Sequence, residues 1–215
     1  PNGCAEKRFE GGRSAMWTGC WRFCDTGAMN QAQFVETVLT NPINRTILAR
    51  LPELGATDCW LVSGALFQTV WNAKTGHPPA HGIKDYDIFY FDPDPSWDAE
   101  DAMIKRANAL FADLGVEIEV RNQGRVHIWY QEKFGTPYPR LARATDGIDR
   151  FLCECAMVGM RPDSDNFDVY IPKGFADIER MTVRPNRMAN FHPDRYIEKA
   201  ARWRAVWPEL TILPA

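Results

Sequence analysis

The sequence predicts an α/β fold, in which strands and helices alternate along one chain. A short apolar strand at Cys59–Val62 leads through Ser63-Gly64 into a run whose apolar residues recur at helical spacing. Further on, residues 84–92 alternate with a period of two, and a helical pattern follows them. A chain of 215 residues that is 45% hydrophobic can bury one core of this kind.

The first part of the chain differs from the rest. Residues 1–28 have no sustained hydrophobic period, so we expect an N-terminal extension there and a single domain over 29–215. Asn30 can cap a first helix that covers 30–39. A second helix is expected over 43–51, because apolar residues repeat there at helical spacing.

The remaining elements follow from periodicity and from helix-capping residues. After the strand at 84–92, Ser96 can open a helix that ends at Gly115. Val116–Tyr130 alternates between apolar and polar residues, which predicts a strand with a turn near 122–124. The elements expected after this strand are a helix near Ile148–Leu152, strands at Ala156–Met160 and Phe167–Ile171, and a closing helix at Asp194–Trp207.

Composition limits the class of protein. No stretch approaches the roughly 20 uninterrupted apolar residues that cross a membrane, and the first residues lack the apolar core of a secretion signal. The six cysteines do not resemble a small disulfide scaffold. Cys20 with Cys24, and Cys153 with Cys155, lack the second pair that a structural zinc site requires. We therefore expect a soluble, cytoplasmic protein without a membrane partner.

The charge distribution bears on the partner. A formal net charge of −3 disfavours long nucleic acids, whose affinity for proteins depends largely on Lys and Arg that neutralise phosphates. We expect a small molecule or a protein side chain instead. From Arg180 to Arg204, however, seven Lys or Arg stand against two acidic residues. This segment could meet a phosphorylated group, including an RNA end, or form a solvated helical face.

Two aspartates on one expected strand are the main candidates for a functional site. Asp85 and Asp87 lie two positions apart, so they project from one face with Cα atoms about 7 Å apart. Their carboxylates can converge on a hard cation such as Mg²⁺. A third carboxylate would come from the next strand, where Glu117 and Glu119 share a face, and we favour Glu119. A pair of exposed structural aspartates is the alternative.

Basic groups and a tight turn accompany these carboxylates. The Ser63-Gly64 turn can offer backbone N–H groups to phosphates at the start of a helix. Lys84, Arg121 and Arg125 lie near the carboxylates and could neutralise a triphosphate. Surface salt bridges are the alternative for each of these three residues.

Three segments carry a resemblance to a known family: LFQTVWNAKTG, GIKDYDIFYFD and GVEIEVRNQGRVHIWY. They resemble a bacterial nucleotidyltransferase-like family within the DNA polymerase β-like nucleotidyltransferase superfamily. The resemblance implies a minimal nucleotidyltransferase fold, with a mixed β-sheet flanked by helices and an N-terminal helical arm. It also implies Gly64, Asp85, Asp87 and Glu119 at the superfamily positions, Mg²⁺ or Mn²⁺ as cofactor, and transfer of an NMP from an NTP to an unidentified hydroxyl acceptor.

Two other functions are compatible with the same residues. The turn reads Ser63-Gly64-Ala65, whereas the superfamily turn usually ends Gly-Ser or Gly-Gly. This difference favours a catalytically inactive nucleotide-binding or regulatory protein on the same fold. The same carboxylates would also serve a metal-dependent phosphohydrolase, which needs no acceptor.

Overall fold

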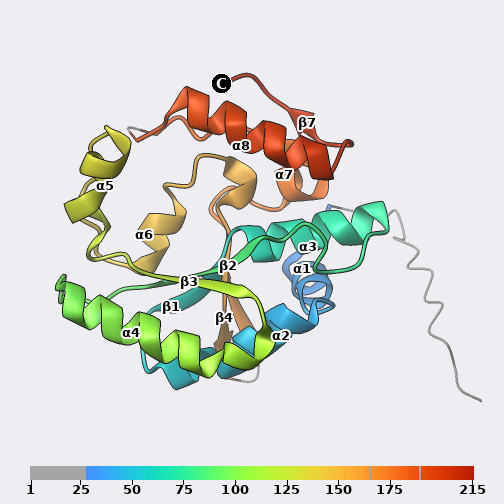
Figure 1. Cartoon of the computed structure of the whole chain (residues 1–215). Coiled ribbons are helices and arrows are strands. Elements are labelled where there is room, and N and C mark those ends of the chain that lie inside the picture. Colours follow the sequence, from blue (N-terminus) through green and yellow to red (C-terminus); the bar gives the residue numbers. More distant parts are fainter. Residues whose placement is uncertain (1–27, 165, 189) are drawn as a thin grey trace, which may run out of the picture.

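The computed structural model describes residues 28–164, 166–188 and 190–215 (Figure 1). The N-terminal extension expected over 1–28 lies outside these residues, apart from Ala28. The strands are β1 (Cys59–Val62), β2 (Asp85–Tyr90), β3 (Glu117–Asn122), β4 (Gly159–Asp163), β5 (Asn166–Tyr170), β6 (Thr182–Val183) and β7 (Thr211–Ile212). The α-helices are α1 (Gln31–Val38), α2 (Pro42–Arg50), α3 (Gly64–Thr75), α4 (Trp97–Leu110), α5 (Val126–Phe134), α6 (Ala144–Ile148), α7 (Ala176–Glu179) and α8 (Pro193–Val206).

Five of these strands form one mixed sheet in the order β3-β2-β1-β4-β5, which confirms the expected fold class. β2 and β3 run parallel, because α4 lies between them in the chain and returns it to the same end of the sheet. β1 pairs antiparallel with β2 and β4, and β4 pairs antiparallel with β5. β3 is therefore an edge strand of this sheet, with β2 as its neighbour.

The two faces of the sheet are covered differently. Leu61 and Ile88 belong to the main core, which they share with residues of α1, α2, α3 and α4. Val62 belongs to a smaller cluster that includes residues of α6. Because Val62 pairs with Asp87, and paired residues share a face, Asp85 and Asp87 lie on the face with the smaller cluster.

The closing helix α8 packs on α3 through tryptophan side chains. Trp71 of α3 meets Trp203 and Trp207 edge to face, with ring centroids 5.8 and 5.5 Å apart. Trp207 Nε1 also donates to Asn72 Oδ1 over 2.8 Å. In Figure 1, α8 (red) lies on the opposite side of the sheet from α2 and α4. Within the described residues, no helix is long and apolar enough to cross a membrane.

Most of the expected elements are confirmed within a residue or two. Asn30 caps α1 through a capping box, and Ser96 caps α4 by accepting the N–H of Ala99. The strand expected at Cys59–Val62 is β1. These segments were predictable because their caps and apolar periods lie within the segments themselves.

The strand expected over Val116–Tyr130 is wrong beyond Asn122. β3 ends there because β2 ends at Tyr90, directly opposite, and leaves no partner for a longer edge strand. The expected turn is present: Asn122 Oδ1 accepts the N–H groups of Asp92 and Gly124 over 3.0 and 2.9 Å. The chain then enters α5, which was not expected.

Further corrections concern α5 and the segment after it. His127, which falls within the strand expected over Val116–Tyr130, lies on α5, where burial and Arg140 lower its pKa. The helix expected near Ile148–Leu152 is α6, which starts earlier because the N–H of Ala144 donates to Asp58 Oδ2 over 2.6 Å. The strand expected at 156–160 begins only at Gly159, because a short 3-10 turn precedes it.

Candidate active site

The acidic residues of β2 and β3 lie side by side. In the parallel register of the two strands, Asp85 is opposite Glu117 and Asp87 is opposite Glu119. Side chains at paired positions share a face of the sheet. Glu117 is exposed at the start of β3, whereas Glu119 and both aspartates are partly buried. Four carboxylates therefore gather on the less covered face.

The environment of Asp87 disfavours a negative charge. Burial raises its pKa from an ordinary 3.8 to about 7, and the charges of Asp85 and Glu119 act in the same direction. The cations of Lys199 and Arg121 oppose this shift. An additional cation beside Asp87 would therefore be stabilised.

Sequence reasoning missed Lys199, which lies on α8 and acts electrostatically on Asp87 across the fold. Its ammonium group also lies over the rings of Phe151 and Trp203, at 6.0 and 5.1 Å from their centroids. The excess of basic residues from Arg180 to Arg204 was the signal in the sequence, but this excess does not distinguish one residue from another.

The donor set on this face suits a hard divalent cation, because Mg²⁺ takes oxygen ligands from carboxylates. Asp85, Asp87 and Glu119 could supply such ligands. In the part of the chain that the structure describes, no three acidic, His or Cys side chains already stand together as a ligand set. The three carboxylates therefore share a face and a local excess of negative charge without converging on one point.

The Ser63-Gly64 turn joins β1 to α3 next to Asp87. Ser63 has a positive φ of 56°, a conformation that costs a non-glycine residue on the order of 1–3 kcal/mol. Its N–H donates to Val158 O over 2.8 Å, which holds the turn against the strand that follows α6 in the chain. No backbone hydrogen bond among the described residues engages the N–H of Gly64, the first residue of α3. This donor is available to an anion at the start of the helix.

Two of the predicted basic residues each pair with one carboxylate. Lys84 Nζ, on an exposed side chain just before β2, lies 3.8 Å from Asp85 Oδ2. An Arg121 guanidinium N–H donates to Glu119 Oε2 over 3.1 Å. Exposed ion pairs of this kind contribute little to stability, so both cations can exchange a carboxylate for another anion at low cost.

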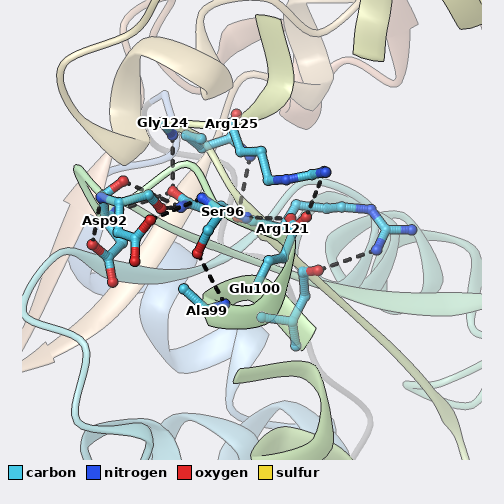
Figure 2. A network of polar contacts seen from close by, with 11 residues as sticks. Asp92, Ser96, Ala99, Glu100, Arg121, Gly124 and Arg125 are labelled. Atoms are coloured by element: carbon cyan, nitrogen blue, oxygen red, sulfur yellow. Dashed lines mark hydrogen bonds and ion pairs between the residues drawn. The ribbon is translucent and has the colours of Figure 1, made fainter. Parts of the chain in front are cut away.

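The third predicted basic residue, Arg125, is held by the buried Glu100 of α4. One carboxylate oxygen of Glu100 accepts the N–H of Asn122 over 3.0 Å, and the other accepts from Arg125 over 3.1 Å. Figure 2 shows the side chains of Arg121 and Arg125 extending in the same direction from the end of β3 and the turn after it. Glu100 thus fixes the position of Arg125 relative to the sheet.

Arg121, which contacts Glu119, and Arg125 line a cavity of about 540 Å³. The cavity lies between the start of α4, the end of β3 and α5. Its other lining residues are Trp97, Glu100, Trp129, Glu132 and Lys133. Sequence reasoning missed this cavity, because three of its seven lining residues lie on α5, which was expected to be a strand.

Comparison with solved structures identifies the fold. An NMR structure described as revealing a CCA-adding enzyme head domain superposes with a TM-score of 0.71 at 24% sequence identity, covering 86% of this chain and 97% of that chain. At this level of identity the likeness establishes the fold alone. No curated protein matches the chain.

The family model described as nucleotidyltransferase matches residues 49–212. The chain therefore belongs to this nucleotidyltransferase family. The matched region contains all of β1, β2 and β3, and it continues through α8. It thus includes the acidic face, the turn and Lys199.

Proposed function

We propose that the protein transfers an NMP group from an NTP to a hydroxyl acceptor. In this proposal Asp85, Asp87 and Glu119 hold Mg²⁺, or Mn²⁺ in its place, and the Ser63-Gly64 turn receives the triphosphate. The observation that carries the proposal is the acidic face of β2 and β3, where burial raises the pKa of Asp87 to about 7. Burial and the neighbouring carboxylates disfavour the charged form of this group, and a nearby cation would stabilise that form.

In the reaction, the acceptor oxygen attacks the α-phosphorus of the NTP. A new phosphorus–oxygen bond forms, the bond from the α-phosphorus to the bridging oxygen breaks, and pyrophosphate leaves. The acceptor hydroxyl gives its proton to a carboxylate, Asp87 or Glu119. A divalent cation at this face supplies charge neutralisation and orientation of the phosphates.

The basic residues have separate tasks in this proposal. Lys199 lies close enough to act on the charge of Asp87, so it can stabilise negative charge that develops on the phosphates. Glu119 would hold the metal, and Arg121, its present partner, would then be free to pair with a phosphate oxygen. Lys84, more exposed, would meet the outer phosphates.

The first test is the thermal stability of the wild type with ATP, GTP, CTP or UTP, with and without Mg²⁺ or Mn²⁺. A ligand at 100 times its dissociation constant adds about 2.7 kcal/mol, which raises Tm by roughly 5 °C or more in a chain of this size. We expect a metal-dependent shift with at least one NTP. We expect this shift to be lost in Asp85→Asn/Asp87→Asn.

Asp163→Asn is the matched control, because it removes an exposed carboxylate of β4. This control should keep the shift. If no NTP shifts the Tm of the folded wild type with either metal, the transfer proposal is wrong. A shift that survives in the double variant would place the metal elsewhere.

A second candidate function is nucleotide binding without transfer. The turn sequence Ser63-Gly64-Ala65, in place of the usual Gly-Ser or Gly-Gly ending, favours it. The two functions differ in pyrophosphate release, measured with a small-molecule cell extract as the source of acceptor. Release that depends on Asp87 supports transfer, whereas metal-dependent NTP binding without release supports the binding function.

A further inference from the structure

The cavity at the end of β3 lies on the other side of Asp87 from the Ser63-Gly64 turn. Val62 pairs with Asp87, and β1 runs antiparallel to β2, so the chain continues from Val62 into the turn toward the Asp85 end of β2. Arg121 follows Glu119 by two residues on the same face of β3. Its Cα therefore lies about 7 Å from that of Glu119 along the strand, in the direction away from the turn. Along the strands, Asp87 and Glu119 thus lie between the turn and the cavity.

Two tryptophans give this cavity an aromatic wall. The side chain of Trp97 is 54% exposed at the first position of α4, and Trp129 of α5 is partly exposed. The guanidinium of Arg125 lies 5.2 Å from the ring centroid of Trp97. An exposed indole supported in this way offers a surface on which a planar heterocycle can stack.

The charges that can reach a ligand in this cavity are mostly positive. Both oxygens of Glu100 are already used, since they hold Arg125 and the N–H of Asn122. Arg125 pairs with Glu100 through one guanidinium nitrogen, and its side chain remains 17% exposed. Lys133 is exposed and lies over the Trp129 ring at 5.6 Å. Arg125 and Lys133 can therefore bind a phosphate, and Glu132 is the acidic lining group left to oppose them.

We propose that this cavity binds the acceptor, and that the acceptor is a free mononucleotide. The base would stack on Trp97, the phosphate would meet Arg125 and Lys133, and a ribose hydroxyl would point toward Asp87. A volume of about 540 Å³ is in the range of small-ligand sites. The net charge of −3 opposes a long polyanion in the same position.

This inference rests on the proposed function for the direction of transfer. The ribose hydroxyl attacks the α-phosphorus of the NTP, a phosphodiester between the two nucleotides forms, and pyrophosphate leaves with the cleaved phosphorus–oxygen bond. The proton of that hydroxyl passes to Asp87 or Glu119. Binding of the mononucleotide itself requires neither metal nor NTP, which allows a separate test.

The test is calorimetric titration of the full chain with AMP, GMP, CMP and UMP in the absence of metal and NTP. We expect at least one of them to bind, and we expect Trp97→Ala and Lys133→Ala each to weaken that binding about tenfold or more. Trp97→Phe should recover most of the affinity, because it restores an aromatic surface. Ile197→Ala removes a side chain of the same exposed fraction, 54%, on α8, and should change nothing.

Three outcomes would overturn the proposal. The first is that none of the four mononucleotides binds. The second is that binding is unaffected by Trp97→Ala but lost in Gly64→Asp, which places a negative charge at the turn; the mononucleotide would then occupy the triphosphate position. The third is that a short single-stranded oligonucleotide binds through Trp97 more than tenfold tighter than any mononucleotide, which would assign the cavity to the end of a nucleic acid.

Failure of this inference can be told apart from failure of the proposed function. Asp85→Asn/Asp87→Asn should lose the metal-dependent NTP shift and keep mononucleotide binding. Trp97→Ala should lose mononucleotide binding and keep the NTP shift. If the double variant instead loses mononucleotide binding, the two sites are one, and the cavity is not a separate acceptor site.

Discussion

At the scale of single residues, the groups around Asp87 shift its pKa in opposite directions. Its burial and the neighbouring Asp85 and Glu119 raise its pKa, while Lys199 and Arg121 lower it. The net result, a pKa of about 7, means that the Asp87 carboxyl keeps its proton up to nearly neutral pH. This state has a measurable consequence for stability.

We expect Asp87→Asn to stabilise the metal-free protein above pH 7 and to change it little at about pH 4. The folded carboxyl titrates at about 7 and the unfolded one near 3.8, so the wild type loses stability as the pH rises between these values. Below about pH 4 both states hold the proton, and the difference vanishes. Each unit of pKa difference corresponds to about 1.4 kcal/mol, so the variant should gain a few kcal/mol over the wild type at alkaline pH.

Urea unfolding of the two proteins at about pH 4 and about pH 8 measures this difference. Asp163→Asn, which removes an exposed carboxylate, should show no such dependence on pH. A gap between Asp87→Asn and the wild type that stays constant across this range would mean that the pKa of Asp87 is ordinary.

At the scale of elements, the turn between β3 and α5 fixes the wall of the cavity. Asn122 is fully buried and accepts from Gly124 and from Asp92 of the loop that follows β2. Its Nδ2 donates to the carbonyl oxygens of Asp92 and Asp94 over 3.2 and 3.1 Å. These bonds hold the loop before α4 against the start of α5, so Trp97 and Arg125 keep their relative positions.

Gly124→Ala should therefore destabilise the protein by about 1–3 kcal/mol. A Cβ at this position would overlap the backbone oxygen of Asp92, which cannot move without breaking the bonds to Asn122. Thermal unfolding should show a lower Tm, by roughly 2–4 °C for each kcal/mol. The variant should also bind mononucleotides less tightly, because Arg125 shifts.

Gly64→Ala is the matched control for this substitution. Its Cβ would meet the end of the Gln68 side chain at 3.1 Å, and a flexible amide can move away. We expect little change in Tm for this control. Equal destabilisation by the two alanines would show that the contact with Asp92 is not what constrains the turn.

At the scale of the whole molecule, the site depends on α8, which lies far from β2 in the sequence. Trp203 and Trp207 pack on Trp71, and Tyr196 donates through its hydroxyl to Val183 O and Leu213 O over 2.9 and 2.6 Å. This packing brings Lys199 to Asp87. A helix that begins more than 100 residues after Asp87 therefore contributes to the electrostatics of the acidic face.

Trp207→Ala should cost about 3–5 kcal/mol of stability, the usual range for removing a large buried aromatic side chain. Trp207 is fully buried, and its loss would also leave Asn72 Oδ1 without its donor. Urea unfolding checks this, with the exposed Trp97→Ala as a control that should change stability little. A cost below about 1 kcal/mol would mean that α8 is not anchored through this residue.

Elements defined by interactions between residues close together in the chain could be predicted from the sequence. Elements that depend on pairing with a distant segment could not. α1, β1, α4 and α8 were predicted closely, since caps and apolar periods are local signals. The strand predicted beyond Asn122, where the structure has α5, was wrong. The alternation of Val126–Tyr130 does not reveal that β2 stops at Tyr90 and leaves β3 without a partner beyond Asn122. The length of an edge strand depends on the strand with which it pairs. The residues of the edge strand do not show where that partner ends.

By itself, the sequence determined that Asp85 and Asp87 share a face, because side chains alternate along any strand. It also pointed to Glu119 and to the turn at Ser63-Gly64 through their order along the chain. Only the tertiary structure decided that Asp87 lies opposite Glu119, that Lys199 acts on it, and that a cavity with two tryptophans lies at the end of β3. Register, burial and charge proximity arise from packing between distant segments, so no local pattern encodes them.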